Sequence, residues 1–125
     1  MAVTGLNHYN ITTPLALLPE VRDFYCEVIG LEQGIKPPSG SPGFWLYAGG
    51  NPILHLSSDE QGHTKTGIST IDHVAFTCTG LDATLTKLDQ LKIAYSFERR
   101  QGDGPQQIFF KDILGNGVEL NFRQA

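Results

Sequence analysis

Four side chains in this sequence are of the types that bind metal ions: His8, His55, His73 and Glu119. The step along the chain from His8 to His73 nearly equals the step from His55 to Glu119, so the four hold matching positions in two halves of the chain. Imidazole nitrogens with one carboxylate suit borderline divalent ions such as Zn²⁺, Fe²⁺, Mn²⁺, Co²⁺ or Ni²⁺. With neutral imidazoles, one such ion leaves the cluster with a charge of about +1, which favours an anionic substrate oxygen. The predicted site is therefore a Lewis acid.

Strand periodicity places the four side chains on a common face. Residues two apart share a face of a strand, and the immediate neighbours of all four are apolar or aromatic. Examples are Tyr9 beside His8, and Leu54 and Leu56 beside His55. We expect helices to cover these apolar faces, which leaves the four ligand-type side chains together on the opposite side.

Each of these residues also has a simpler interpretation. A single histidine on a strand is usually a structural residue, and Glu119 alone fits a solvated charge at a sheet edge. The shared parity and the matched spacing of all four favour a common site. His63 lies in a polar segment without such support, and we interpret it as a loop residue.

The two halves of the sequence follow the same pattern, which indicates an internal repeat. Segments 6–12 and 71–77 both follow the order apolar, polar, His, apolar or aromatic, small, apolar, Thr. The similar offsets at both ends of the module indicate a duplication, so we expect two similar halves related by pseudo-twofold symmetry. The predicted elements of the first half are a strand over 6–12, a helix from Pro19 to Gly30 with Val21, Phe24, Tyr25 and Val28 on one face, and strands over 31–36, 44–48 and 52–57. Those of the second half are a strand over 71–78, a helix with an apolar stripe through Leu81, Leu85, Leu88 and Leu91, and strands over 95–100, 106–111 and 117–122.

Length and composition are those of an ordinary globular domain. We expect one domain over 1–125, with a first module at 1–57, a linker at 58–70 and a second module at 71–125. The net charge of −4 and the lack of a basic cluster argue against a nucleic-acid partner. No run approaches the ~20 apolar residues of a membrane span, so we expect a cytoplasmic protein without a membrane partner. Cys26 and Cys78 have no CxxC spacing and are expected to be reduced thiols.

Beyond these patterns, the chain resembles the vicinal oxygen chelate superfamily, which includes glyoxalase I, fosfomycin-resistance thiol transferases, extradiol dioxygenases and bleomycin-binding proteins. The resemblance rests on the paired His-bearing strands and on segments 24–31 (FYCEVIGL) and 110–120 (FKDILGNGVEL), and it covers nearly the whole chain. Segments 45–47 and 53–56 are most similar to those of uncharacterised glyoxalase-like proteins.

This resemblance implies an α+β fold of two tandem βαβββ modules that form a cupped mixed sheet around one metal ion, with helices outside. The family's ligands map onto His8, His73 and Glu119, and Glu119 is also expected to be the catalytic carboxylate. His55 falls where glyoxalase I has a metal-bound glutamate. An imidazole there changes charge and basicity, which argues against lactoylglutathione lyase activity.

Three functions follow from the resemblance. The first is a lyase- or isomerase-like enzyme whose divalent ion chelates vicinal oxygens of a small-molecule substrate and stabilises an enolate or oxyanion. The second is an extradiol-type dioxygenase, although a fourth ligand at His55 would fill a position that such enzymes leave open. The third is a metal-free protein that binds a small molecule, such as a drug. The ligand set favours the first.

Further substrate contacts are expected from four side chains. Trp45 and Phe109 hold matching positions in the two halves, with the same offset as His55 and Glu119, and would line the cavity or pack in the core. Gln107 shares the parity of Phe109, and Arg99 or Arg100 would bind a substrate anion from a nearby loop. We also expect a homodimer, because the sheet edges of such small modules need covering.

Overall fold

The computed structural model describes residues 1, 4–38, 42–58, 71–99 and 105–122. Most of the predicted linker, His63 and Arg100 therefore lie outside the described residues. The chain divides into two compact units, unit 1 over Met1–Gly67 and unit 2 over Ile68–Ala125. The boundary between them falls inside the segment predicted as the linker.

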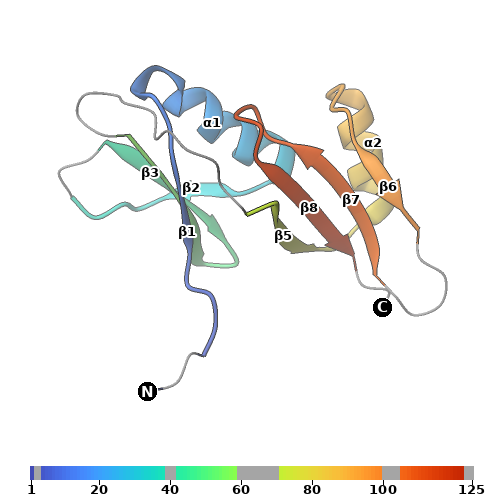
Figure 1. The fold of residues 1–125 in the computed structure, drawn as a ribbon, viewed down its shortest axis with the longest axis horizontal. Helices are drawn as coiled ribbons and strands as arrows, with labels where there is room; N and C mark the ends of the chain where they lie inside the picture. Colours follow the sequence, from blue (N-terminus) through green and yellow to red (C-terminus); the bar gives the residue numbers. More distant parts are fainter. Residues whose placement is uncertain (2–3, 39–41, 59–70, 100–104, 123–125) are drawn as a thin grey trace. The chain divides into compact units, whose positions relative to one another are not determined.

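Unit 1, coloured from blue to green in Figure 1, is one four-stranded mixed sheet with a helical segment. Its strands lie in the order β1-β4-β3-β2. Its elements are β1 (Tyr9–Thr12), the 3₁₀ turn η1 (Leu15–Leu17), α1 (Leu18–Phe24), the π-helical turn η2 (Tyr25–Ile29), β2 (Glu32–Gly34), β3 (Gly43–Ala48) and β4 (Asn51–Ser57).

Unit 2 repeats this arrangement with strand order β5-β8-β7-β6. Its elements are β5 (His73–Cys78), α2 (Leu81–Gln90), β6 (Ser96–Glu98), β7 (Gln106–Lys111) and β8 (Gly117–Phe122). Both units therefore have the order strand, helix, three strands. The predicted α+β fold of two tandem modules is confirmed.

The strand register shows how closely the two sheets correspond. In each unit the first and last strands are parallel, and the remaining neighbours are antiparallel. Asn10 on β1 pairs with His55 on β4, and Ala75 on β5 pairs with Glu119 on β8. His55 and Glu119 therefore hold the same position in the same strand of each sheet.

The helical segment of unit 1 begins and ends as the sequence predicts. Pro19 lies in the first turn of α1, where its missing N–H breaks no helical hydrogen bond. Gly30 follows η2 with φ of 91°, a left-handed conformation that suits glycine at a helix C-terminus. Val21, Tyr25 and Val28 are buried against the sheet, together with Ile11, Leu18, Leu31, Leu46, Leu54 and Leu56.

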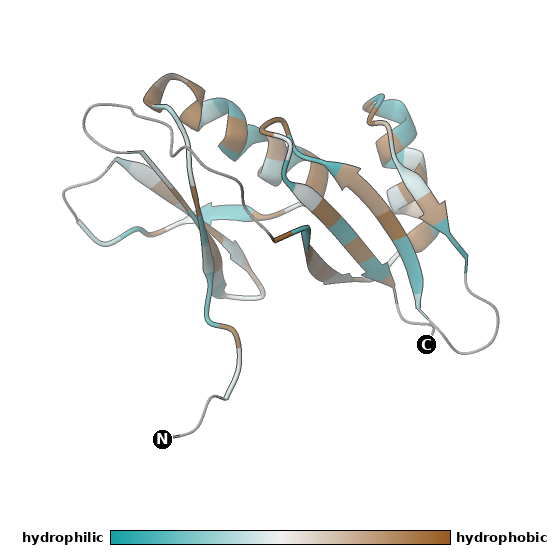
Figure 2. Cartoon of the chain, viewed as in Figure 1, coloured by the Kyte–Doolittle hydropathy of each residue, from teal (hydrophilic) through white to brown (hydrophobic). Residues whose placement is uncertain are grey.

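The core of unit 2 lies between its sheet and α2. Leu88 is fully buried at the centre of the predicted apolar stripe. Along β8, hydrophobic and hydrophilic residues alternate (Figure 2). The apolar face of β8, which consists of Val118, Leu120 and Phe122, is buried with Phe76, Ile108 and Phe110.

The main differences from the sequence predictions are at strand ends. The strands predicted to begin at residues 6 and 71 begin at Tyr9 and His73. The pairing of β1 with β4 begins at Tyr9 and Leu54, although β4 itself begins three residues earlier, at Asn51. The edge strands β2 and β6 are both much shorter than predicted, at Glu32–Gly34 and Ser96–Glu98. Neither helix within the described ranges has the length or apolar run that a membrane span requires.

Candidate metal centre

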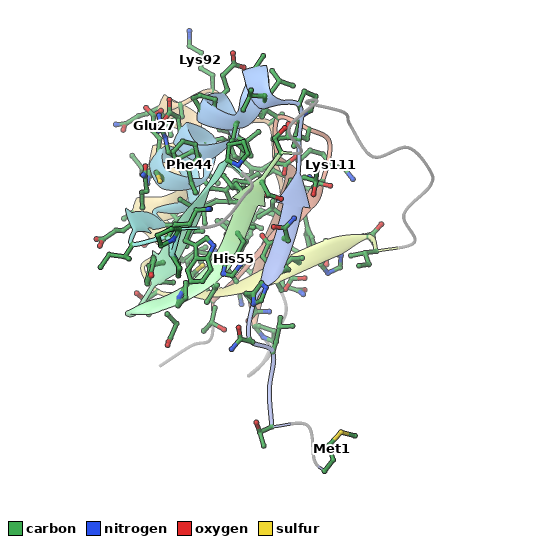
Figure 3. All side chains as sticks on the ribbon, turned by 90° about the vertical axis from the view of Figure 1, so that its left-hand side faces the viewer. Met1, Glu27, Phe44, His55, Lys92 and Lys111 are labelled. Atoms are coloured by element: carbon green, nitrogen blue, oxygen red, sulfur yellow. The ribbon has the colours of Figure 1, made fainter. Side chains whose placement is uncertain are left out.

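Three rings stack on the sheet of unit 1. His55 lies on β4, the strand that pairs with both β1 and β3, and is labelled in Figure 3. Its ring centroid lies 4.0 Å from that of Trp45, with 7° between the planes. The ring of His8 is also stacked on His55, with a centroid distance of 3.8 Å and 16° between the planes. Trp45 is opposite His55 in the β3–β4 register, which explains why these two rings meet.

Hydrogen bonds fix which nitrogen of each unit 1 histidine is protonated. The His8 Nδ1 lies 2.7 Å from Asn7 Oδ1, an oxygen that only accepts, so Nδ1 donates and the neutral ring keeps a lone pair on Nε2. The His55 ring forms a hydrogen bond with the backbone of Pro52. Because proline has no N–H, the ring donates this bond to the carbonyl oxygen. In the described structure, the buried Nε2 of His55 has no hydrogen-bond partner.

The environment of His55 favours the neutral imidazole. Burial lowers its pKa below the ordinary value, and the neighbouring His8 lowers it further, while the bond to Pro52 acts in the opposite direction. Burial therefore favours the uncharged ring, and its Nε2 is enclosed within the described structure.

Unit 2 contains a histidine–carboxylate pair. His73 Nε2 lies 3.2 Å from Glu119 Oε1, and His73 Nδ1 lies 2.9 Å from Asp72 Oδ2. The hydrogen bond to Asp72, followed by the charge of Glu119, raises the pKa of His73, although partial desolvation opposes this. The same bond lowers the pKa of Asp72. A metal ion would have to displace a proton from His73 Nε2.

Two amides hold the other oxygen of Glu119. Its Oε2 accepts from Asn121 Nδ2 at 2.9 Å and from Gln107 Nε2 at 3.3 Å. Asn121 shares the face of Glu119 on β8, and Gln107 lies on the neighbouring strand β7. Glu119 is only 5% exposed, but both of its carboxylate oxygens have polar partners. Oε2 accepts from the two amides, and Oε1 faces His73.

The remaining candidates from the sequence have distinct positions. The rings of Phe109 and His73 form a T-shaped pair, with a centroid distance of 5.8 Å and 85° between the planes. Arg99 is exposed, and its guanidinium lies 5.1 Å from the centre of the Phe97 ring. Gln107, expected to contact substrate, bonds to Glu119. Whether these side chains touch a substrate stays a prediction.

Sequence reasoning missed three polar residues of these half-sites: Asn7, Asp72 and Asn121. A signal for each was present in the sequence. Asn7 and Asp72 directly precede the two matched histidines, and both have a side-chain oxygen that accepts from Nδ1. Asn121 lies two positions beyond Glu119 and so shares its face of the strand.

The donor set fits a divalent ion. Each unit brings together two of the predicted ligands, and among the described residues no group of three His, Cys, Asp or Glu side chains forms a metal-binding cluster. His8 and His73 both have Nδ1 on an oxygen acceptor, the arrangement that orients metal-bound histidines in proteins. In unit 2, Glu119 adds a carboxylate beside His73.

Two matched modules, each with the order strand, helix, three strands, have the architecture expected of the vicinal oxygen chelate superfamily. The sequence model of the glyoxalase/bleomycin resistance protein/dioxygenase superfamily matches residues 5–120. The chain belongs to this superfamily, as the sequence analysis predicted. Among curated proteins, none matches the chain significantly in sequence.

Solved structures show the same fold at low sequence identity. A protein assigned to the glyoxalase family from Bacillus anthracis is 22% identical, with a TM-score of 0.79 over 99% of this chain and 98% of that one. A variant of the fosfomycin resistance protein FosX from Listeria monocytogenes, in complex with Mn(II) and 1S,2S-dihydroxypropylphosphonic acid, is 17% identical, with a TM-score of 0.73 over 99% and 95%. TnmS3, an antibiotic binding protein from Streptomyces, is 17% identical, with a TM-score of 0.67 over 99% of each chain.

Proposed function

We propose that the protein is a divalent-metal-dependent enzyme of the glyoxalase type that acts on a small molecule with vicinal oxygens. His8 from unit 1 and His73 and Glu119 from unit 2 are the proposed ligands, and His55 is the fourth ligand-type side chain. The observation that carries this proposal is the matched tethering of His8 and His73 through Nδ1. It leaves a lone pair on His8 Nε2, and it places His73 Nε2 3.2 Å from Glu119 Oε1, where an ion would replace the proton between them.

The chemistry divides between the ion and the side chains. A bound divalent ion would chelate two neighbouring substrate oxygens and stabilise an enolate or oxyanion. The amides of Gln107 and Asn121 fix Glu119 through Oε2, so Oε1 is the oxygen available to bind the ion or to accept a substrate proton. The ring of Trp45, which stacks on His55, would form an apolar side of the substrate cavity.

Metal analysis tests this proposal directly. We expect about one divalent ion per site in protein purified without a chelating tag, or after reconstitution with Mn²⁺, Zn²⁺, Fe²⁺ or Ni²⁺. His73→Ala and Glu119→Gln should each abolish tight binding, as measured by competition with a chromophoric chelator. Both replacements leave the apolar face of the sheet unchanged, so circular dichroism should still show a folded protein.

Thr77→Ala is the matched control for the ligand variants. Thr77 is exposed on β5 and lies on the same face of the strand as His73. Its replacement should leave the metal content unchanged. No stoichiometric binding by the wild-type protein with any of the four ions would contradict the proposal.

A metal-free small-molecule-binding protein is the second candidate. The antibiotic-binding relative and the ring stack of unit 1 favour it, because a partly exposed aromatic surface suits a planar ligand. Glu119→Gln distinguishes the two functions. Ligand affinity that is unchanged in this variant would identify a binding protein, whereas joint loss of metal and ligand would identify the enzyme.

A further inference from the structure

The stack of His8 on His55 restricts how these two histidines can act. A metal ion bound to an imidazole nitrogen lies in the plane of that ring, about 2.1 Å from the nitrogen. Two rings that share one ion therefore need planes that intersect at the ion. The planes of His8 and His55 are only 16° apart and their centroids are 3.8 Å apart. Nearly parallel planes at this separation meet far beyond bonding distance, so the stacked rings do not share an ion.

His55 is the more constrained of the two rings. Trp45 covers its other face at 4.0 Å, so the imidazole is enclosed between two aromatic surfaces. The bond to the Pro52 carbonyl fixes its orientation within the stack. His8 is exposed, and its ring has a stacking partner in His55 and a hydrogen bond to Asn7. Moving His55 to bind an ion would give up both of its ring contacts, whereas His8 has its Nε2 available in place.

We propose that His55 is a positioning residue that stays outside the metal coordination shell and supports the His8 ring through the Trp45–His55–His8 stack. This inference rests on the proposed metal-dependent function. The sequence predicts His55 as a fourth metal ligand. In this proposal His55 instead supports the ring of His8 by stacking and does not bind the ion. The protein ligands are then two imidazoles and one carboxylate, and more than one position on the ion is open to substrate oxygens.

Replacement of His55 by phenylalanine separates ring stacking from metal coordination. Phenylalanine keeps a flat ring between Trp45 and His8 but has no nitrogen to bind an ion. We expect the Kd of His55→Phe for Mn²⁺ and Zn²⁺ to stay within about threefold of wild type. His55→Ala removes the stack, and its Kd should rise by about 10- to 100-fold, as for the loss of other groups that orient a ligand. A loss of binding in His55→Phe as large as in His73→Ala would overturn the inference.

A measurement on the wild-type protein does not depend on whether the variant folds. Pulsed electron paramagnetic resonance of the Cu²⁺-loaded protein counts the imidazoles bound to the ion. We expect two in the wild type and two in His55→Phe. Three in the wild type would make His55 a ligand and overturn the inference while the proposed function stands. Failure of the wild type to bind any of the ions would overturn both.

Trp45 provides an independent test of the stack. Trp45→Leu should weaken metal binding several-fold because His55 loses one of its two aromatic contacts. Trp45→Phe should restore it. An unchanged Kd in Trp45→Leu would show that the stack does not support His8.

Discussion

At the scale of single residues, the sequence located the ligand-type side chains but not the groups that orient them. Apolar neighbours at alternate positions predicted that His55 and Glu119 oppose the core, and the buried Leu54, Leu56 and Val118 confirm this pattern. The bonds from Nδ1 to Asn7 and Asp72 depend on side-chain rotamers, which a period-2 pattern does not specify.

Asp72 offers the sharpest test of this orientation. Asp72→Ala removes the acceptor for His73 Nδ1 and should raise the metal Kd by about 10- to 100-fold. The reason is that the ring loses both its fixed orientation and its preferred tautomer. The affinity can be measured by competition with a chromophoric chelator.

Asp72→Asn is the matched control for this substitution, because unit 1 uses asparagine at the equivalent position, Asn7. An amide oxygen still accepts from Nδ1, so this variant should bind metal more tightly than Asp72→Ala. Equal losses in the two variants would show that charge, and not the hydrogen bond, is what Asp72 provides.

At the scale of elements, repetition in the sequence predicted more than periodicity alone. The nearly equal offsets between the two halves predicted matched strands, and the structure pairs Asn10 with His55 as it pairs Ala75 with Glu119. The ends of strands could not be predicted from composition, because they depend on where pairing with the neighbouring strand begins. The residues before Tyr9 have strand-like composition but no ladder partner.

Gly117 tests the link between strand pairing and the candidate site. It pairs with His73, and a Cβ there would clash with the carbonyl oxygen of Asp72 and lie 2.9 Å from His73 Cβ. Gly117→Ala should therefore lower the free energy of unfolding by about 1–3 kcal/mol. It should also weaken metal binding, because the Asp72–His73 pair must shift. Urea denaturation and metal titration measure the two effects.

Gly5→Ala is the control for this substitution. A Cβ at Gly5 has no heavy atom within 4 Å, so the free energy of unfolding should change by no more than about 0.5 kcal/mol. Unchanged stability in Gly117→Ala as well would show that the β5–β8 pair tolerates the displacement of Asp72.

At the scale of the whole molecule, we predict a homodimer. In both sheets the outer strands, β1 and β2 in unit 1 and β5 and β6 in unit 2, each pair along one edge only in the described structure. Exposed strand edges favour association with another chain. Light scattering coupled to size-exclusion chromatography should give twice the chain mass of 13.7 kDa. A monomer at micromolar concentration would contradict this prediction.

A mixture of two variants identifies which chains contribute to one site. His8→Ala and His73→Ala each damage one half-site and should bind metal poorly alone. If sites are shared between chains, a heterodimer of the two variants contains one site with both histidines, and half of the binding capacity returns. If each site lies within one chain, a verified heterodimer recovers none. The spacing of the ligands along the sequence is the same whether a site lies within one chain or is shared between two chains. The sequence therefore could not distinguish these two arrangements.

The parallel pairing of β1 with β4 and of β5 with β8 also affects the order of folding. Within the hairpins, the paired residues are close along the chain, as in Leu46 with Leu54 and Phe110 with Val118. The parallel pairs join residues that are several times farther apart in sequence, as in Asn10 with His55. Closing the longer loop loses more chain entropy, so each hairpin should form before its parallel partner docks. The strands that follow His8 and begin at His73 are thus the last to join their sheets, and an ion that binds these histidines would stabilise the slowest contacts of the fold.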